Sequence, residues 1–147
     1  MVKRLPQLER FICITYPQID FLIPSDYVAS SVGVKDLNLF LLSDQKSGFF
    51  DFDEIASQFI QIPRESSIKT MIVLKDVDGK RLSLLTTQEC KVCMIDLREF
   101  GLFSDFYSEQ FKKLGFLACS FKEERLRMLM DVRQTVNYLN DCFLEEL

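Results

Sequence analysis

Hydrophobic residues in this chain fall mostly into short runs separated by polar turns, which is the pattern of β-strands. The first run, 11–16, is rich in β-branched and aromatic residues and stops at Pro17. A second run at 19–23 follows so closely that the two runs predict a hairpin. Further strands are expected at 37–42, 49–52, 70–74, 81–86, 90–95, 116–121 and 126–130, and 27–34 is expected to be either a short strand or an extended linker.

Three segments instead carry apolar residues at helical spacing. Asp53 is expected to cap a short helix that presents Ile55, Ala56, Phe59 and Ile60 on one face. A second helix is expected at 104–114, ended by Gly115 in the left-handed conformation. The third is expected to begin at Asp131 and to dock an amphipathic face on the rest of the chain.

The order of elements repeats although the letters do not. Strand, charged turn, strand, aspartate and helix occur at 37–60 and again at 116–143, each time after a hairpin. Short strands at regular spacing favour small barrels over a parallel sheet. The chain is therefore expected to be mainly β with a few helices, as one domain over 1–147, with halves at approximately 24–66 and 67–130 on which the N-terminal strands 11–23 and the C-terminal helix 131–144 pack.

Composition excludes several classes of function. The chain has 147 residues, a net charge of −4 and a pI of about 4.9, which disfavours binding to a phosphate backbone. It carries 14 Phe and no Trp, so many apolar rings must be buried in a core or in a binding surface. No apolar run is long enough for a membrane span or resembles a secretory signal, and a cytoplasmic location is the expectation.

Histidine is absent, which removes Ser-His and Cys-His nucleophilic pairs and His metal ligands. The chain is therefore not expected to be an enzyme, and no catalytic, cofactor-binding or metal-binding residue is assigned. Cys90 and Cys93 have the spacing of a redox motif, but they lie in an apolar stretch expected to be a strand, where residues three apart point to opposite faces. Structural thiols, redox chemistry and a zinc site with Cys119 and Cys142 remain the three interpretations.

Asp51, Asp53 and Glu54 can be interpreted in two ways. They could act as paired carboxylates in acid–base chemistry. They could equally cap the helix that follows them, which is the simpler interpretation of acidic residues at a helix start.

Several residues, in order, resemble the CheW-like domain of chemotaxis coupling proteins. The matching segments are 22–28 after the first hairpin, 39–59 with an acidic residue before a helix, 92–99 with an acidic end, and 115–119 followed by 127–132, which closes with Leu-Met-Asp-Val before the last helix. The resemblance implies two five-stranded SH3-like barrels. It also implies a non-catalytic adaptor that links chemoreceptor tips to the regulatory domain of a CheA-like histidine kinase, without a cofactor.

In CheW-like proteins an apolar groove between the barrels takes the receptor tip, and the matching positions here are Val32, Val34, Leu37 and Val92. Ordinary core packing is the alternative interpretation of these four residues. The family's Asn-Leu-Arg-Gly turn is replaced by residues 42–45, which contain neither arginine nor glycine. A CheW-like module that serves another partner, or a cysteine-based redox or metal-binding barrel, therefore remains an alternative.

Overall fold

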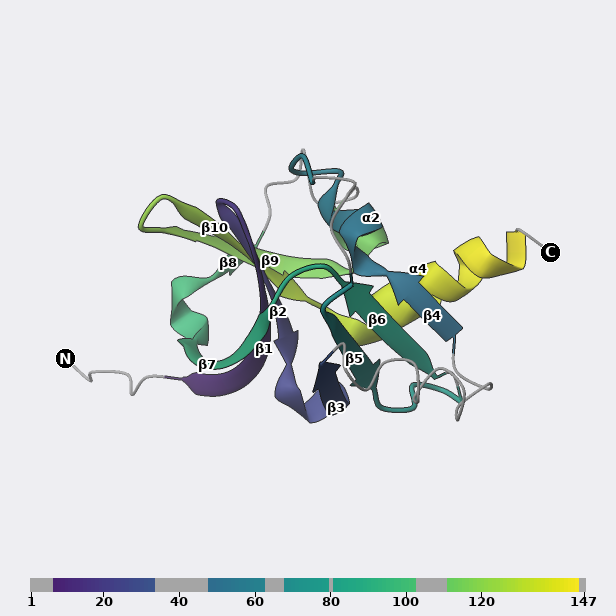
Figure 1. Cartoon of the computed structure of the whole chain (residues 1–147). Helices are drawn as coiled ribbons and strands as arrows, with labels where there is room; N and C mark the ends of the chain where they lie inside the picture. Colours follow the sequence, from purple (N-terminus) through teal and green to yellow (C-terminus); the bar gives the residue numbers. More distant parts are fainter. Residues whose placement is uncertain (1–6, 34–47, 63–67, 80, 103–110, 146–147) are drawn as a thin grey trace.

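The computed structural model describes residues 7–33, 48–62, 68–79, 81–102 and 111–145. Ten strands of these residues form two mixed sheets (Figure 1). In chain order the elements are β1 (Leu8–Tyr16), β2 (Ile19–Pro24), η1 (Ser25–Tyr27), β3 (Val28–Gly33), β4 (Gly48–Asp51), α2 (Phe52–Ala56), β5 (Thr70–Leu74), β6 (Leu82–Thr86), β7 (Cys90–Asp96), η3 (Leu97–Glu99), β8 (Gly101–Leu102), β9 (Phe116–Lys122), β10 (Arg125–Met130) and α4 (Val132–Glu145).

The larger sheet has the order β7-β1-β2-β10-β9-β8, and the smaller has the order β3-β5-β6-β4. Each contains one parallel pairing, β2 with β10 and β4 with β6, and is otherwise antiparallel. The expected fold class, mainly β in two subdomains with a C-terminal helix, is confirmed. Of the described strands, six lie in the larger sheet and four in the smaller one. Strands β7 and β8 lie at opposite edges of the larger sheet.

The sheets do not follow a boundary at residues 66 and 67. The smaller sheet takes β3 and β4 from before that point and β5 and β6 from after it. The N-terminal strands β1 and β2 lie inside the larger sheet, between β7 and β10. The reason is that strands which pair with each other are distant in the chain, so each sheet combines strands from both halves of the sequence.

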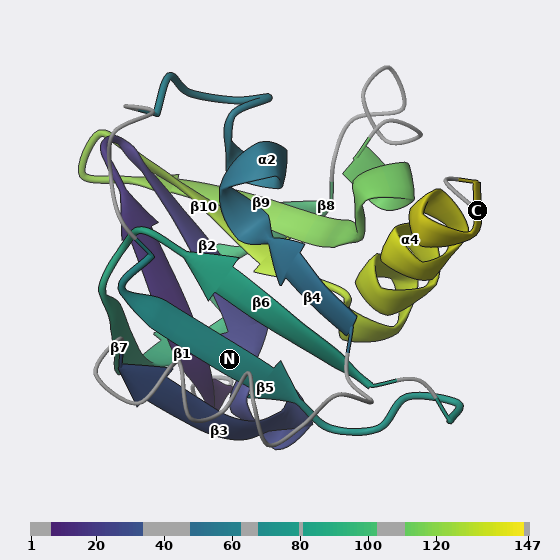
Figure 2. The ribbon, with the colours of Figure 1, turned by 45° about the vertical axis from the view of Figure 1, so that its right-hand side comes forward.

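From Phe11 onward, β1 is buried on both faces, which explains its continuous apolar run. Ile12 and Ile14 point into the main core, which is shared by both sheets, α2 and α4. Phe11 and Cys13 point the other way into a smaller core made only by the larger sheet and the residues after β7. Figure 2 shows the smaller sheet lying in front of the larger one, with α4 along one side of the molecule.

A β-bulge in β9 gives Phe116 its place in the main core. Ala118 pairs with Leu129, whereas Phe116 pairs with Met130, so Leu117 is an extra residue without a direct partner. Regular alternation would put Phe116 on the same face as Ala118, in the smaller core. The bulge reverses this, and Phe116 packs in the main core with Met130.

Helix α4 begins as the sequence predicts. The Asp131 carboxylate accepts a hydrogen bond from the Gln134 backbone N at 3.2 Å. Gly115 adopts a φ of 91°, as expected for its left-handed stop, although residues 104–110 of the preceding expected helix lie outside the described ranges. No helix within those ranges is long and apolar enough to cross a membrane.

Candidate protein-interaction surfaces

The outer part of β7 exposes apolar side chains to solvent. Val92 is 61% exposed, Met94 is 56% exposed, and Leu8 on the neighbouring strand β1 is 56% exposed. Val92 pairs with Ile12 and Met94 pairs with Arg10, and cross-strand partners point to the same side of a sheet. These side chains therefore form one exposed row, which we name the β7 edge (Leu8, Val92 and Met94).

The backbone of β7 is also available at this edge. The Leu97 backbone N donates a hydrogen bond to the Gln7 carbonyl at 3.0 Å, so this residue faces β1. Backbone groups alternate in direction along an antiparallel strand, and Val92 and Met94 are an odd number of residues from Leu97. Their N–H and C=O groups therefore point away from β1, on the side where no described strand pairs with β7.

The four residues expected to bind a partner lie in different places. Val92 is exposed on β7, at one edge of the larger sheet. Val32 is half-buried on β3, at an edge of the smaller sheet, where it pairs with Met71. Val34 and Leu37 lie outside the described residues. Two of the four are thus placed, one on an edge strand of each sheet, and of these two Val92 is exposed and Val32 half-buried.

A second apolar surface lies on β9. Phe121 is 74% exposed and Leu117 is 46% exposed, and the half-buried Cys119 lies between them in the strand. Phe121 pairs with Leu126, whose side chain contacts the main core. We name Leu117 and Phe121 the β9 surface. The strands β1, β2 and β10 separate it from the β7 edge, so two partners could be bound at different sites.

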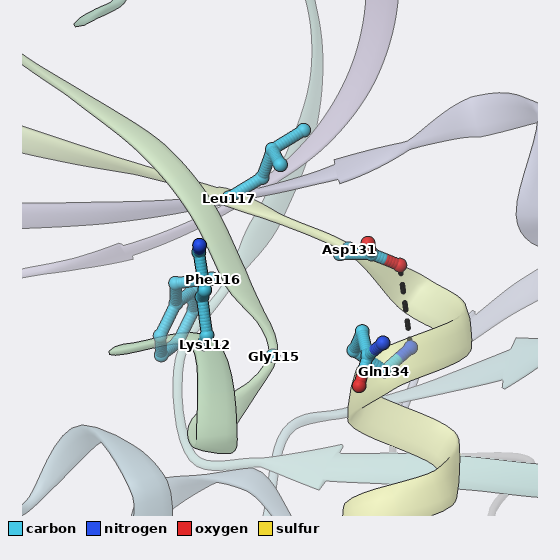
Figure 3. A pocket seen from close by; sticks show the side chains of 6 residues that line it. All are labelled: Lys112, Gly115, Phe116, Leu117, Asp131 and Gln134. Carbon is cyan, nitrogen blue, oxygen red and sulfur yellow. Dashed lines mark hydrogen bonds between the residues drawn. The ribbon is translucent and has the colours of Figure 1, made fainter. Parts of the chain in front are cut away.

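A small cavity of about 250 Å³ opens beside the β9 surface, where β9 approaches the start of α4. Figure 3 shows Lys112 and Leu117 on one side of it and Gln134 on the other. Asp131 also lines it, but that carboxylate already caps α4. Small-molecule and cofactor sites are about 300 Å³ or larger, so the cavity has the size of a subsite for one side chain of a partner.

Sequence reasoning missed a buried polar cluster that joins the two sheets through α2. The Asp53 carboxylate accepts hydrogen bonds from the hydroxyls of Tyr16 on β1, Thr86 on β6 and Thr87. Tyr16 and Thr86 are almost fully buried, and their hydroxyl oxygens lie 3.0 Å apart. Burial and the bond to Asp53 raise the pKa of Tyr16, so its hydroxyl stays protonated and continues to donate.

The expected cap of this short helix is therefore corrected. Asp51, not Asp53, is the N-cap of α2, and its carboxylate accepts from the Asp53 backbone N at 3.0 Å. Glu54 is exposed, whereas Asp53 is buried and fully engaged with hydroxyl donors. Partial burial raises the pKa of Asp51. The three acidic residues thus have three different environments, and only Asp53 belongs to the buried cluster.

The cysteines lie in the environments expected for structural thiols. Cys90 pairs with Ile14 and Cys93 pairs with Phe11, and these two partners belong to opposite cores, so the thiols point to opposite faces of the sheet. Burial raises the pKa of Cys13 to about 12 and that of Cys90 to about 11. Among the described residues, no group of three or more Cys, Asp or Glu is placed to hold a metal ion.

Comparisons with known proteins give one line of similarity. No family model matches the chain, and no curated protein matches it. A solved structure does match, that of the scaffolding protein TtCheW from Thermoanaerobacter tengcongensis. The match covers 87% of this chain and 86% of that one, with a TM-score of 0.52 and 9% sequence identity. This chain therefore has a diverged CheW-like fold.

Proposed function

We propose that this chain is a non-catalytic signalling adaptor of the CheW type, which couples chemoreceptors to a CheA-like histidine kinase by protein–protein contacts. The observation that carries the proposal is the CheW-like fold over 87% of the chain. Fold alone does not determine function, so the argument also needs sites that could hold partners. The β7 edge and the β9 surface supply two exposed apolar sites.

The two sites fit the physical requirement for an adaptor, which must hold two partners at once. Exposed Val92 makes the β7 edge the candidate site for the receptor tip, together with Val32, Val34 and Leu37. The β9 surface, with its adjoining cavity, is then the candidate site for the regulatory domain of the kinase. Modest affinity at each site is sufficient, because linkage of many copies in an array multiplies the effect of each contact.

Titration of the whole chain against two proteins from its own source would test this proposal. One is the regulatory domain of the CheA-like kinase, and the other is the cytoplasmic tip of a chemoreceptor. Val92→Asp should weaken binding of the receptor about tenfold or more and spare the kinase, because it places a charge in an apolar contact. Phe121→Asp should have the converse effect.

Lys75→Gln provides the matched control. It changes the net charge by the same amount as the two aspartate variants, at an exposed position just after β5 in the smaller sheet. It should leave both affinities unchanged. A wild-type chain that binds neither protein would refute coupling, and binding to a different kinase or motility protein would instead favour a diverged CheW-like module.

A further inference from the structure

The four edges of the two sheets are not equally protected against pairing with another strand. Within the described residues, β8 covers two residues and β4 covers four, and β3 has a register shift between Val28 and Ser30. Short or irregular edge strands resist intermolecular pairing. Strand β7 has seven residues, pairs with β1 without a register shift and contains no proline.

The β7 edge combines the two features that drive pairing between strands. The backbone N–H and C=O groups of Val92 and Met94 point outward, ready to accept a new strand. The side chains of the same two residues are more than half exposed and apolar. An added strand would therefore gain backbone hydrogen bonds and bury apolar area at the same positions.

We propose that two copies of this chain associate through their β7 strands, antiparallel, about a two-fold axis that passes between the two Cys93 residues. In this register Val92 of one copy lies opposite Met94 of the other, and each pair occurs twice because of the symmetry. Both residues have outward backbone groups, so these are the hydrogen-bonded pairs. The two sheets join into one continuous sheet.

The charges at this edge complement each other in the same register. Lys91 of one copy lies opposite Ile95 of the other, and Ile95 pairs within its own sheet with Glu9. Lys91 and Glu9 are both exposed, and neither forms an ion pair with another described residue of its own chain. Across the two-fold axis, each Lys91 can reach the other copy's Glu9 over Ile95. The contact therefore contains two equivalent ion pairs.

The register also brings the two Cys93 residues together. They form a non-hydrogen-bonded pair, for which the Cα atoms of antiparallel strands lie about 4.5 Å apart. That distance falls within the range that a disulfide spans. Mild oxidation with dipyridyl disulfide, which takes two electrons from two thiols and releases two pyridinethiones, should therefore link two copies through Cys93.

Sedimentation of the whole chain over a range of concentrations, with and without this oxidant, provides the first test. The expected result is a concentration-dependent dimer that becomes covalent on oxidation, whereas Cys93→Ser dimerises but does not cross-link. A monomer at every concentration up to millimolar would overturn the proposal. A dimer that does not cross-link at Cys93 would overturn it as well.

A charge exchange provides the second test and separates the contact from general effects on folding. Lys91→Glu should weaken the dimer about tenfold, because each of the two ion pairs between Lys91 and Glu9 is then replaced by two carboxylates that repel each other. Glu9→Lys should weaken it similarly. The double variant should restore the dimer, and failure of that rescue would overturn the register. None of these outcomes requires a signalling partner, so the dimer is tested apart from the proposed adaptor function. The dimer would cover Val92, the residue proposed to contact the receptor tip, so the two contacts would compete for the β7 edge.

Discussion

Gly115 lies so close to Thr135 of α4 that a Cβ added to the glycine would stand 2.7 Å from the Thr135 Cα and closer still to its side chain. The Gly115 carbonyl also accepts hydrogen bonds from the Asp131 backbone N at 2.7 Å and from the Thr135 hydroxyl at 3.2 Å. The start of β9 and the first turn of α4 are thereby held in direct backbone contact.

Gly115→Ala should therefore lower the free energy of unfolding by about 2–4 kcal/mol, because it adds both a clash with backbone and an unfavourable positive φ. Gly79→Ala is the matched control, since Gly79 has a φ of 79° but no atom within 4 Å of the added Cβ. It should cost about 1 kcal/mol. Urea unfolding of both variants measures the difference, and equal costs would contradict the close contact.

The buried cluster around Asp53 predicts a large effect of a small chemical change. Asp53→Asn replaces one acceptor oxygen by an NH₂ group that faces hydroxyl donors, so the free energy of unfolding should fall by about 2–4 kcal/mol. Tyr16→Phe should cost about 1–2 kcal/mol. Glu54→Gln, the same change at the next and exposed residue, should be nearly neutral. A neutral Asp53→Asn would show that the cluster does not stabilise the fold.

Asp96 should titrate abnormally although it lies at the surface. Hydrogen bonds from the Arg98 side chain and backbone lower its pKa from 3.8 to about 2. A lowered pKa in the folded state means that this contribution to stability is complete above the unfolded value and is lost as the pH falls from 3.8 toward 2. An NMR titration should give a midpoint near 2, and Arg98→Gln should move the midpoint up toward 3.8.

The thiols of Cys13 and Cys90 should alkylate slowly in the folded chain. A rise in pKa from 9.0 to about 12 leaves Cys13 with about a thousandfold less thiolate near neutral pH, and a rise to about 11 leaves Cys90 with about a hundredfold less. Peptide mapping after treatment with iodoacetamide at pH 8 measures both sites, with chain unfolded in guanidinium as the control. Rapid alkylation of folded Cys90 would revive the redox interpretation.

Local sequence patterns predicted the positions of the strands better than they predicted which strands pair with each other. The strand expected at 70–74 coincides with β5, and those expected at 90–95 and 126–130 differ from β7 and β10 by one residue. Turn chemistry also held at Gly115, which has the expected positive φ. These features depend on a few neighbouring residues, and the sequence displays those residues directly.

The pairing of distant strands was not predictable from the same patterns. Nothing in the apolar run of β1 indicates that its neighbour is β7, about 80 residues later in register. The bulge at Leu117 depends on which face its partner β10 presents, and the Asp53 cluster depends on three separate elements. Of the candidate binding residues, Val92 is exposed, as a contact residue must be. Its position on an edge strand could be recognised only from the order of strands in the sheet, which the sequence does not reveal.

The parallel pairing of β2 with β10 has a consequence for synthesis of the protein. Ile19 becomes available early in translation, but its partner Leu126 is made about 100 residues later. The apolar β1–β2 hairpin must therefore leave the ribosome with one side unsatisfied, a state prone to aggregation. Synthesis of β10, rather than emergence of any earlier segment, sets the moment at which the larger sheet can close.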